Sequence, residues 1–358
     1  MWPTRRLCDL FQIEHPIIQA PMTGSDTRAL AVAVSNAGGL GSLGAGEKSP
    51  DSLRDLTGQM RAGTNRAFNL NFFAYAAPQA DPVALSKTVE RLRPYYQELG
   101  LGDPPQELPE KGPGFDEARL ALALEVRPPV ISFHFGVPDE TAITSLKEAG
   151  ITLMCSATTV AEARALEASG MDAIIAQGRE AGGHRGSHVP TAPSDGVGTL
   201  ALVPQVVDAV DVPVIAAGGI GDGRGIAAAF ALGASGVQIG TGFLSCPEAG
   251  TDEARRALLH SASDEDTMVT DAVSGRSARG RRSRYASEMA ASREALVDYP
   301  YMYAFSGPLV EADKAAGGED FGFHLYGQAA ALNRELSAAE LLQRLVDETF
   351  EVFGRLSG

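Results

Sequence analysis

The fold is decided by Pro213-Val214-Ile215-Ala216-Ala217-Gly218-Gly219-Ile220, followed at a short distance by Gly236-Val237-Gln238-Ile239-Gly240-Thr241. Each stretch is an apolar, partly β-branched run that ends in glycine, which is typical of a buried parallel strand whose tip lets a ligand approach the backbone. A helix over residues 222–232 is expected between them. In a closed (β/α)8 barrel, the loops after two such strands form a phosphate site, because glycine leaves peptide N–H groups open to an anion. Two ordinary strand-to-helix turns are the alternative, and the Gln-Ile-Gly-Thr sequence favours the phosphate site.

Eight short apolar segments in total alternate with helical stretches. The strand candidates are residues 16–20, 40–43, 67–72, 130–135, 152–155, 173–176, 212–217 and 236–239. The helical stretches between them include residues 27–36, 139–149, 160–168 and 200–210, and several end at a glycine that stops a helix (Gly38, Gly150, Gly170 and Gly233). This alternation predicts a parallel sheet, and eight strands predict a closed TIM barrel. A doubly wound open sheet is the alternative, but no Gly-x-Gly-x-x-Gly follows the first strand.

Two longer regions interrupt this alternation of strands and helices. Residues 74–126 contain two helical stretches around a Pro/Gly-rich segment, and residues 246–358 are mostly helical in pattern. Insertions at the C-terminal face of a barrel usually form a lid or a second small domain. We therefore expect a cofactor-binding barrel of residues 1–73 and 127–245, with a smaller, mainly helical lid domain of residues 74–126 and 246–358.

Composition limits the classes of partner. The net charge of −15 disfavours binding to nucleic acid or to anionic membranes, and 44% hydrophobic residues allow a sizeable core. No apolar run reaches the roughly 20 residues that span a bilayer, and residues 1–18 do not resemble a signal peptide. Cys8, Cys155 and Cys246 are isolated, so neither a disulfide framework nor a metal site is expected. These features predict a soluble, cytoplasmic protein, either a monomer or a homodimer.

The predicted strand tips are rich in amides and glycines and poor in carboxylates. In chain order the tip residues are Ala20, Pro21, Met22, Gly44, Asn69, Asn71, His134, Ser156, Gln177, Gly218, Gly219, Gln238, Ile239, Gly240 and Thr241. Paired acids for glycoside chemistry and clusters with metal-ligand spacing are both lacking. Amides and backbone N–H groups suit a flat polar heterocycle with a phosphate tail, and flavin mononucleotide (FMN) fits that description. A sugar phosphate fits less well, because it normally needs a carboxylate or lysine for acid–base chemistry.

His134 lies in the fourth strand candidate. Strand alternation places Ile131, Phe133 and Phe135 on the face toward the helices, and Ser132 and His134 toward the barrel interior. A histidine at the barrel mouth is expected to titrate near neutrality and to be able to act as a general base. The alternative is a buried histidine satisfied by a neighbouring hydrogen bond. Its position at an inward-facing tip favours the functional interpretation.

Two further segments supply candidates for the substrate side of the site. The glycine-rich loop 178–186 allows close contact with a cofactor and carries Gly182, His184 and Arg185. The side chain of His184 or of Arg185 could contact a phosphate or gate the site. A flexible surface loop is the alternative, and it is preferred for Arg179 and Glu180. Tyr299 and Tyr303 belong to an aromatic tail segment that either forms a wall over the ligand or simply packs the tail onto the barrel.

These residues together resemble the nitronate monooxygenases, formerly called 2-nitropropane dioxygenases. The resemblance covers most of the chain and is carried by Gln19-Ala20-Pro21-Met22, Asn69-Leu70-Asn71, Ser132-Phe133-His134-Phe135-Gly136, Gln177-Gly178, Ala181-Gly182-Gly183-His184, Ala217-Gly218-Gly219-Ile220 and Gln238-Ile239-Gly240-Thr241. The glycine segments are shared with other FMN barrels, including enoyl-ACP reductases, and Ser-Phe-His-Phe-Gly is the sharper signal for the class I enzymes. The resemblance implies that Met22, Asn69, Gln177, Gly182, Gly219 and residues 238–241 hold FMN, and that His134 is the catalytic histidine.

The implied function is oxidation of alkyl nitronates, such as propionate 3-nitronate, by O2 to a carbonyl compound and nitrite. A nitronate is already a carbanion equivalent, so only a neutral nitroalkane needs a base, for which His134 is the candidate. The alternative enzyme is an NAD(P)H-dependent FMN reductase of a quinone or an enoyl thioester. A flavin-binding regulatory protein is the non-enzymatic alternative, and a histidine beside the ring argues against it.

Overall fold

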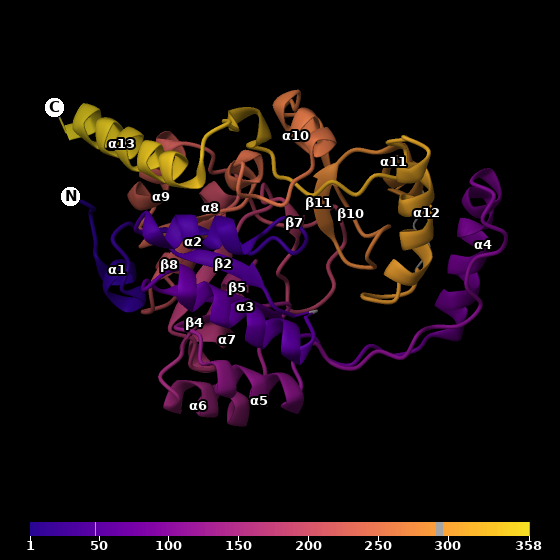
Figure 1. Ribbon diagram of the computed structural model, residues 1–358, viewed down its shortest axis with the longest axis horizontal. Coiled ribbons are helices and arrows are strands. Elements are labelled where there is room, and N and C mark those ends of the chain that lie inside the picture. The colour runs from indigo at the N-terminus through magenta and orange to yellow at the C-terminus, as the bar shows by residue number, and fades with distance from the viewer. Residues whose placement is uncertain (47, 291–295, 358) are drawn as a thin grey trace.

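The computed structural model describes residues 1–46, 48–290 and 296–357, and an eight-stranded parallel sheet forms its centre (Figure 1). The strands are β1 (Ile17–Gln19), β2 (Gly41–Gly44), β3 (Phe68–Phe73), β4 (Val130–His134), β5 (Thr152–Ala157), β6 (Ala173–Gln177), β8 (Val214–Ala217) and β9 (Gly236–Ile239), paired in the order β1-β9-β8-β6-β5-β4-β3-β2. A parallel bridge between Ile18 and Leu40 closes the ring, since the N–H of Gln19 donates to the Leu40 carbonyl at 3.0 Å. The eight predicted strands are all present, and the predicted TIM barrel is confirmed.

Side-chain alternation separates an inner from an outer core. Ile18, Met154, Ile175 and Ile215 form an interior cluster with residues of the short helix α1 (Arg6–Phe11), which contributes Leu7 and Phe11. The other strand parity, which includes Ile131, Phe133, Val214 and Val237, belongs to a larger cluster shared with the outer helices. The polar residues of the predicted tips therefore have the parity that points into the barrel.

The outer helices begin and end where the sequence chemistry requires. They are α2 (Arg28–Asn36), α3 (Pro50–Gly63), α5 (Glu117–Val126), α6 (Glu140–Glu148), α7 (Val160–Ala168), α8 (Thr199–Val207), α9 (Gly223–Ala231) and α13 (Ala338–Ser357). Side chains that accept a backbone hydrogen bond cap six of them: Thr27, Ser49, Asp116, Asp139, Thr159 and Asp222. The four glycines predicted to stop helices all have positive φ, from 79° to 94°. The helix α3 was not anticipated, although Ser49-Pro50 is a helix-start signal.

A second hydrophobic core lies outside the barrel. It joins α4 (Pro82–Glu98) to residues 272–321 and contains Tyr95, Tyr285, Phe305 and Phe321. The other elements of this region are α10 (Glu253–His260), β10 (Thr267–Thr270), β11 (Ala278–Arg281), α11 (Arg284–Ala290), α12 (Tyr303–Ala315) and η2 (Ala330–Leu332). In Figure 1, α4 lies next to α12, at the end of the molecule away from α13. The two insertions thus share one apolar core.

The region after residue 246 is less helical than its pattern suggested. The strands β10 and β11 form a three-stranded antiparallel sheet with β7 (Gly183–His184), which belongs to the barrel loop after β6. Each of these strands has at most four residues, and β11 carries two arginines. Such short polar strands lack the apolar alternation by which a strand is predicted.

Two helices assigned to the lid by sequence pack against the barrel. The helix α5 contacts α3 and α6, and α13 contacts α2 and α9 (Figure 1). We therefore propose that residues 115–126 and 338–357 belong with the barrel, and that residues 76–114 and 246–337 form the lid. Residues 291–295 and 358 of the expected lid lie outside the described part.

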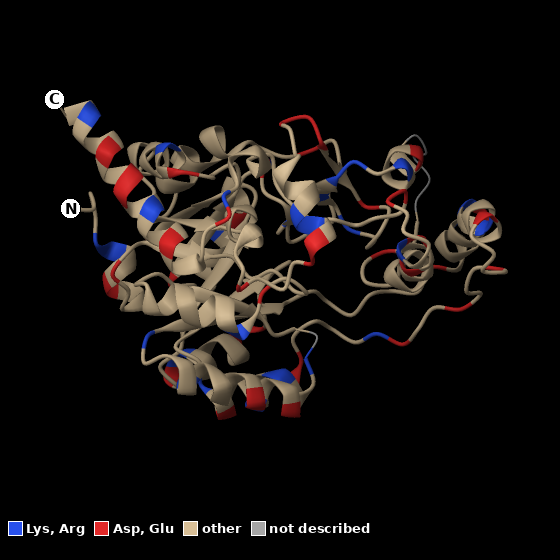
Figure 2. Ribbon diagram, turned by 45° about the horizontal axis from the view of Figure 1, so that its top comes forward, with Lys and Arg blue, Asp and Glu red and all other residues tan. Residues whose placement is uncertain are grey.

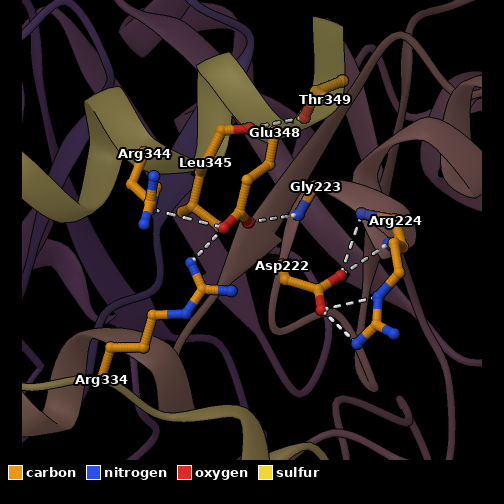
Figure 3. A network of polar contacts seen from close by, with 9 residues as sticks. Asp222, Gly223, Arg224, Arg334, Arg344, Leu345, Glu348 and Thr349 are labelled. Atoms are coloured by element: carbon orange, nitrogen blue, oxygen red, sulfur yellow. Dashed lines mark hydrogen bonds and ion pairs between the residues drawn. The ribbon is translucent and has the colours of Figure 1, made fainter. Parts of the chain in front are cut away.

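The docking of α13 is polar as well as apolar. The Glu348 carboxylate accepts from Arg334 at 2.7 Å and from the N–H of Gly223 at 3.2 Å (Figure 3). Along its exposed side α13 carries residues of both charge signs (Figure 2). None of the described helices is both long and apolar enough to cross a membrane.

Candidate active site

A buried amide network lies inside the barrel on β2, β3 and β4. The Nδ2 of Asn69 lies 3.1 Å from Ser42 Oγ and 2.9 Å from Ser132 Oγ, and Asn71 Nδ2 also donates to Ser132 Oγ at 2.9 Å. Among the described residues, neither Oδ1 of Asn69 nor Oε1 of Gln238 on β9 has a hydrogen-bond partner, although both atoms are buried. An unsatisfied buried acceptor costs about 1–3 kcal/mol. A ligand with N–H donors at the barrel mouth would remove that cost.

The glycines at the tip of β8 receive the loop after β6. Gly218 and Gly219 have φ values of 105° and 73°, which favour glycine. A Cβ at Gly218 would lie 2.8 Å from the N of Ala181, and one at Gly219 would lie 3.2 Å from Glu180 Cβ. The absence of side chains at these two positions therefore lets the loop lie directly over the strand tip.

Gly240 brings the β9 tip next to the β1 tip. A Cβ at Gly240 would lie 3.4 Å from Ala20 Cβ and 3.6 Å from Met22 Sδ. The Ile239 side chain packs in the outer core, and its carbonyl accepts from the N–H of Ala20 at 2.8 Å. Pro21 continues the chain between Ala20 and Met22 and is partly exposed. The predicted cofactor residues of these two strands are thus adjacent, but the Ile239 side chain lies in the outer core and only its backbone reaches the strand tip.

The helix termini near these glycines differ in how they are capped. The N-terminus of α9 is closed, because Asp222 accepts from two of its N–H groups and Glu348 accepts from a third (Figure 3). The short 3-10 helix η1 (Thr241–Ser245) follows its N-cap residue Gly240 and has no side-chain cap. An anion at this edge of the barrel is therefore expected at the start of η1, as in other TIM-barrel phosphate sites.

Gly182 lies at the same end of the barrel. A Cβ at Gly182 would lie 2.4 Å from the N of Gly327, and that N–H donates to Thr241 Oγ1 at 2.9 Å. The segment at Gly327 therefore bridges the loop after β6 and the start of η1. It lies beside the start of η1, and the sequence did not indicate this contact.

His134 is held by hydrogen bonds on both ring nitrogens. Its Nδ1 lies 3.0 Å from Ser156 Oγ, and its Nε2 lies 3.1 Å from the carbonyl oxygen of His184. Burial is the main cause that lowers the pKa of His134 to about 3, and the nearby His184 and the charge of Arg276 lower it further. The expectation that it titrates near neutrality is thus not met, because its surroundings disfavour the charged imidazolium.

Gln177 shares a partner with His134. Its Nε2 donates to the His184 carbonyl at 3.0 Å, while its Oε1 accepts from the N–H of Gly186 at 2.7 Å. The Gln177 amide therefore acts both as a donor and as an acceptor, and both hydrogen bonds hold the loop that carries His184. In this arrangement Gln177 orients the loop, and any contact with a ligand has to share or replace these bonds.

Phe135 does not follow the predicted alternation. Strand β4 ends at His134, and Phe135 has a left-handed φ of 73°. This turn directs its ring to His134, at a centroid distance of 4.8 Å, and to His184 at 5.6 Å, instead of toward the helices. A left-handed non-glycine residue costs free energy and is often found at functional sites.

Aromatic rings enclose the two histidines. We call this group the aromatic cluster; it consists of Phe73, His134, Phe135, His184, Tyr299 and Tyr303. Tyr299 lies 5.1 Å from Phe135 and 5.7 Å from His184 between ring centroids, and the Tyr303 hydroxyl lies 3.5 Å from His184 Nε2. The tail tyrosines therefore fold back over the strand tips, an arrangement that both sequence interpretations allow, and their role toward a ligand stays a prediction.

The lid holds His184 in place. In β7, Gly183 pairs with Arg279 and His184 pairs with Ala278 of β11, and His184 Nε2 lies 2.9 Å from Ser274 Oγ. Burial, then the charge of Arg276, lowers the pKa of His184 to about 4. Both histidines of the cluster are therefore neutral at physiological pH.

Two charged residues of the loop have structural roles that sequence reasoning did not assign. Glu180 accepts from the N–H of Thr199 at 2.8 Å and so caps α8, whose N-cap residue Gly198 has no side chain. Arg185 is 3% exposed and donates to the Gly178 carbonyl at 2.7 Å. The glycine at the helix start was the available signal for a cap supplied from elsewhere.

Comparison with known proteins places the chain in a family. A sequence model of the family described as nitronate monooxygenase matches residues 4–348. Nitronate monooxygenase of Paraburkholderia phytofirmans is 47% identical over 348 residues, which make up 96% of this chain and 94% of that protein. Nitronate monooxygenase of Pseudomonas aeruginosa is 45% identical, with 96% of this chain and 99% of that protein covered.

A solved structure agrees with these relatives. Nitroalkane oxidase from Streptomyces ansochromogenes matches with a TM-score of 0.89 and 39% identity, covering 98% of this chain and 99% of that chain. The similarity thus extends over barrel and lid alike. The chain is therefore an oxidoreductase that belongs to the nitronate monooxygenase family.

Proposed function

We propose that the chain binds FMN across the barrel mouth and oxidises alkyl nitronates, such as propionate 3-nitronate, with O2 to a carbonyl compound and nitrite. The observation that carries the cofactor assignment is the pair of buried acceptors, Asn69 Oδ1 and Gln238 Oε1, that have no donor among the described residues. A flavin ring edge carries an N–H donor, and the uncapped start of η1 suits its phosphate. Met22, Gly182, Gly219 and Thr241 complete the proposed set of contacts.

Bound FMN would supply the electron acceptor and the reaction with oxygen. The chain supplies position and surroundings. His134, neutral and with its proton on Nε2, can donate a hydrogen bond to a nitro or nitronate oxygen when it shares that proton with the His184 carbonyl or turns it away from that oxygen. The aromatic cluster, including His184, Tyr299 and Tyr303, would enclose the substrate and exclude water. A nitronate has already lost its α-proton, so its oxidation does not depend on a free base in the site.

The visible spectrum of the purified protein is the first test. The flavin ring itself gives an absorption band in the range of about 440–460 nm. Anaerobic mixing with propionate 3-nitronate should bleach this band, and air should restore it with release of nitrite. Prompt bleaching by NADH, with none by the nitronate, would identify the reductase alternative instead. A colourless protein that takes up no FMN would overturn the proposal.

We further propose a cytoplasmic location and a monomeric or homodimeric state. The three cysteines are buried and unpaired, which supports a reducing compartment. Light scattering after size exclusion, with and without reductant, tests both the state and the absence of intermolecular disulfides.

A further inference from the structure

Arg276 is a buried cation at the edge of the aromatic cluster. It lies in the turn between β10 and β11 and is only 7% exposed. Its guanidinium carbon lies 4.1 Å from the centroid of the Phe135 ring, and its Nη2 donates to the Ser187 carbonyl. The ring on which it rests is the one that the left-handed backbone at Phe135 turns toward the histidines.

The charge of Arg276 has no carboxylate partner. Within the described part of the chain, no Asp or Glu oxygen lies within 4 Å of it, and its buried Nε lacks a hydrogen-bond partner. By contrast, Arg284 of the lid pairs with Glu98 at 2.5 Å and with Asp320 at 3.0 Å. Burial lowers the pKa of Arg276 to about 10, so the guanidinium stays charged at neutral pH. An unpaired buried charge is rare unless a ligand completes it.

Arg276 is also tied to His184 through its backbone. Its N–H lies 3.3 Å from Ser274 Oγ, and Ser274 donates its single hydroxyl proton to the Arg276 carbonyl at 2.9 Å. His184 Nε2, 2.9 Å from the same oxygen, must then be the donor to it. The turn that carries the cation therefore also fixes the tautomer of His184.

We propose that Arg276 is a positioning residue that makes this site prefer an anionic substrate. The inference rests on the proposed function and deepens it by assigning the preference for nitronate over neutral nitroalkane to one side chain. With a nitronate bound, the anion and the guanidinium balance in a water-poor site, whereas a neutral nitroalkane leaves the cation unmatched.

The other charged and titratable groups around the cluster do not provide this balance. On the barrel side they are His134, His184, Arg185 and Glu162, and on the lid side they are Asp298, Tyr299 and Tyr303. The two histidines are neutral, Arg185 adds a second positive charge, and Glu162 accepts from the N–H of His188 at 2.9 Å and from Thr158. Glu162 and Asp298 act on Arg276 only from beyond ion-pair distance, so among the described residues no carboxylate contacts the guanidinium that rests on Phe135.

The test compares R276M with R276K in the flavin-loaded protein. The matched control is R282M, because Arg282 is an exposed arginine that lines a separate cavity of about 1100 Å³ beside β10. Two kinds of measurement are made. Steady-state kinetics give KM and kcat for propionate 3-nitronate and for neutral nitroethane. The change in flavin absorbance gives the dissociation constant of nitrate, an inert planar anion.

We expect R276M to raise the nitronate KM and the nitrate Kd by about 10- to 100-fold, since one charge contact at a partly buried site has that size. The KM for nitroethane should change by less than about threefold. R276K keeps the charge but loses the planar group that stacks on Phe135, so its nitronate KM and nitrate Kd should fall between those of the wild type and R276M. R282M should stay within about threefold of the wild type on all three constants. Should R276M fail to fold, R276Q removes the charge at similar length and carries the same expectation.

Equal weakening for nitronate and nitroethane, or an unchanged nitrate Kd in R276M, would overturn the inference. A wild type that binds nitrate through Arg276 but turns over no nitronate would instead overturn the proposed function and leave the anion site standing. The two failures are thus distinguishable.

Discussion

The Nε2 of His134 lies 3.1 Å from the carbonyl oxygen of His184. A carbonyl oxygen only accepts, so Nε2 carries the proton and Nδ1 accepts from Ser156 Oγ at 3.0 Å. In this tautomer no lone pair of His134 is free. To donate to a substrate, His134 has to share its Nε2 proton with the His184 carbonyl or turn it away from that oxygen, whereas acting as a base requires that Nδ1 leave Ser156. Oxidation of a nitronate needs only the first of these.

Replacement of His134 by Asn should separate the two substrate classes. Asn keeps a hydrogen-bond donor but cannot take a proton, so nitroethane turnover should fall by about 100-fold or more, while nitronate turnover falls by less than about tenfold. Steady-state kcat/KM for both substrates, measured with the flavin content of each preparation, checks this. Equal losses on both would assign His134 a single role in binding.

The neutral histidines should make the protein labile to acid. The pKa of His134 is lowered to about 3 and that of His184 to about 4, from 6.5. The unfolded chain therefore binds more protons than the folded one below pH 6.5, and stability is lost as pH falls through the window from 6.5 to 4. Each histidine contributes a slope of up to about 1.4 kcal/mol per pH unit there.

Urea unfolding of the wild type and H184N at pH 8, 6.5, 5.5 and 4.5 measures this slope. The stability difference between them should be constant above pH 7 and should shift in favour of the variant below 6.5. The contribution of the carboxylates to the pH dependence cancels in this comparison, because they titrate in both proteins. A difference that does not change with pH would show that His184 is protonated at the same pH in both states.

Much of the fold follows from the sequence because it depends on short-range patterns. The eight strands are apolar runs of correct parity, and glycines such as Gly38 and Gly170 mark helix ends with positive φ. The β10–β11–β7 sheet could not be predicted in this way. It pairs β7 with residues about 95 positions later in the chain, such as Gly183 with Arg279, and nothing local in these short strands specifies that partner.

The same distinction between local patterns and long-range contacts holds for the candidate site. The inward parity of Asn69, His134 and Gln177 follows from strand alternation and is observed. The orientation of Phe135 does not follow, because a left-handed φ immediately after the strand reverses it. Arg276 could not be singled out either, since its significance depends on the absence of a carboxylate, and that is a property of the folded neighbourhood.

The left-handed Phe135 allows a paired test of strain. F135A removes the ring and keeps the Cβ at φ 73°, whereas F135G removes the ring and the strain together. Both variants should be less stable than the wild type, because the ring packs on Phe73 at 5.1 Å and under Arg276. F135G should be more stable than F135A by about 1 kcal/mol. Equal stability in urea would mean that the backbone relaxes at this position.

The docking of α13 on the barrel depends on one glycine. A Cβ at Gly223 would lie 2.4 Å from the N of Thr349 and 2.5 Å from the carbonyl carbon of Glu348, so two backbones meet there without room for a methyl group (Figure 3). G223A should therefore destabilise the protein by about 1–3 kcal/mol, because neither helix backbone can yield without losing the Glu348 contacts.

The matched control is the glycine within α13 itself, Gly354, where an added Cβ would have nothing within 4 Å. The control G354A should be neutral or stabilising by up to about 1 kcal/mol, since alanine is the better helix former. Urea unfolding of both variants, with limited proteolysis from the C-terminus, makes the comparison. A G223A protein as stable as G354A, with α13 still protected, would show that the close approach of α13 to α9 is not required.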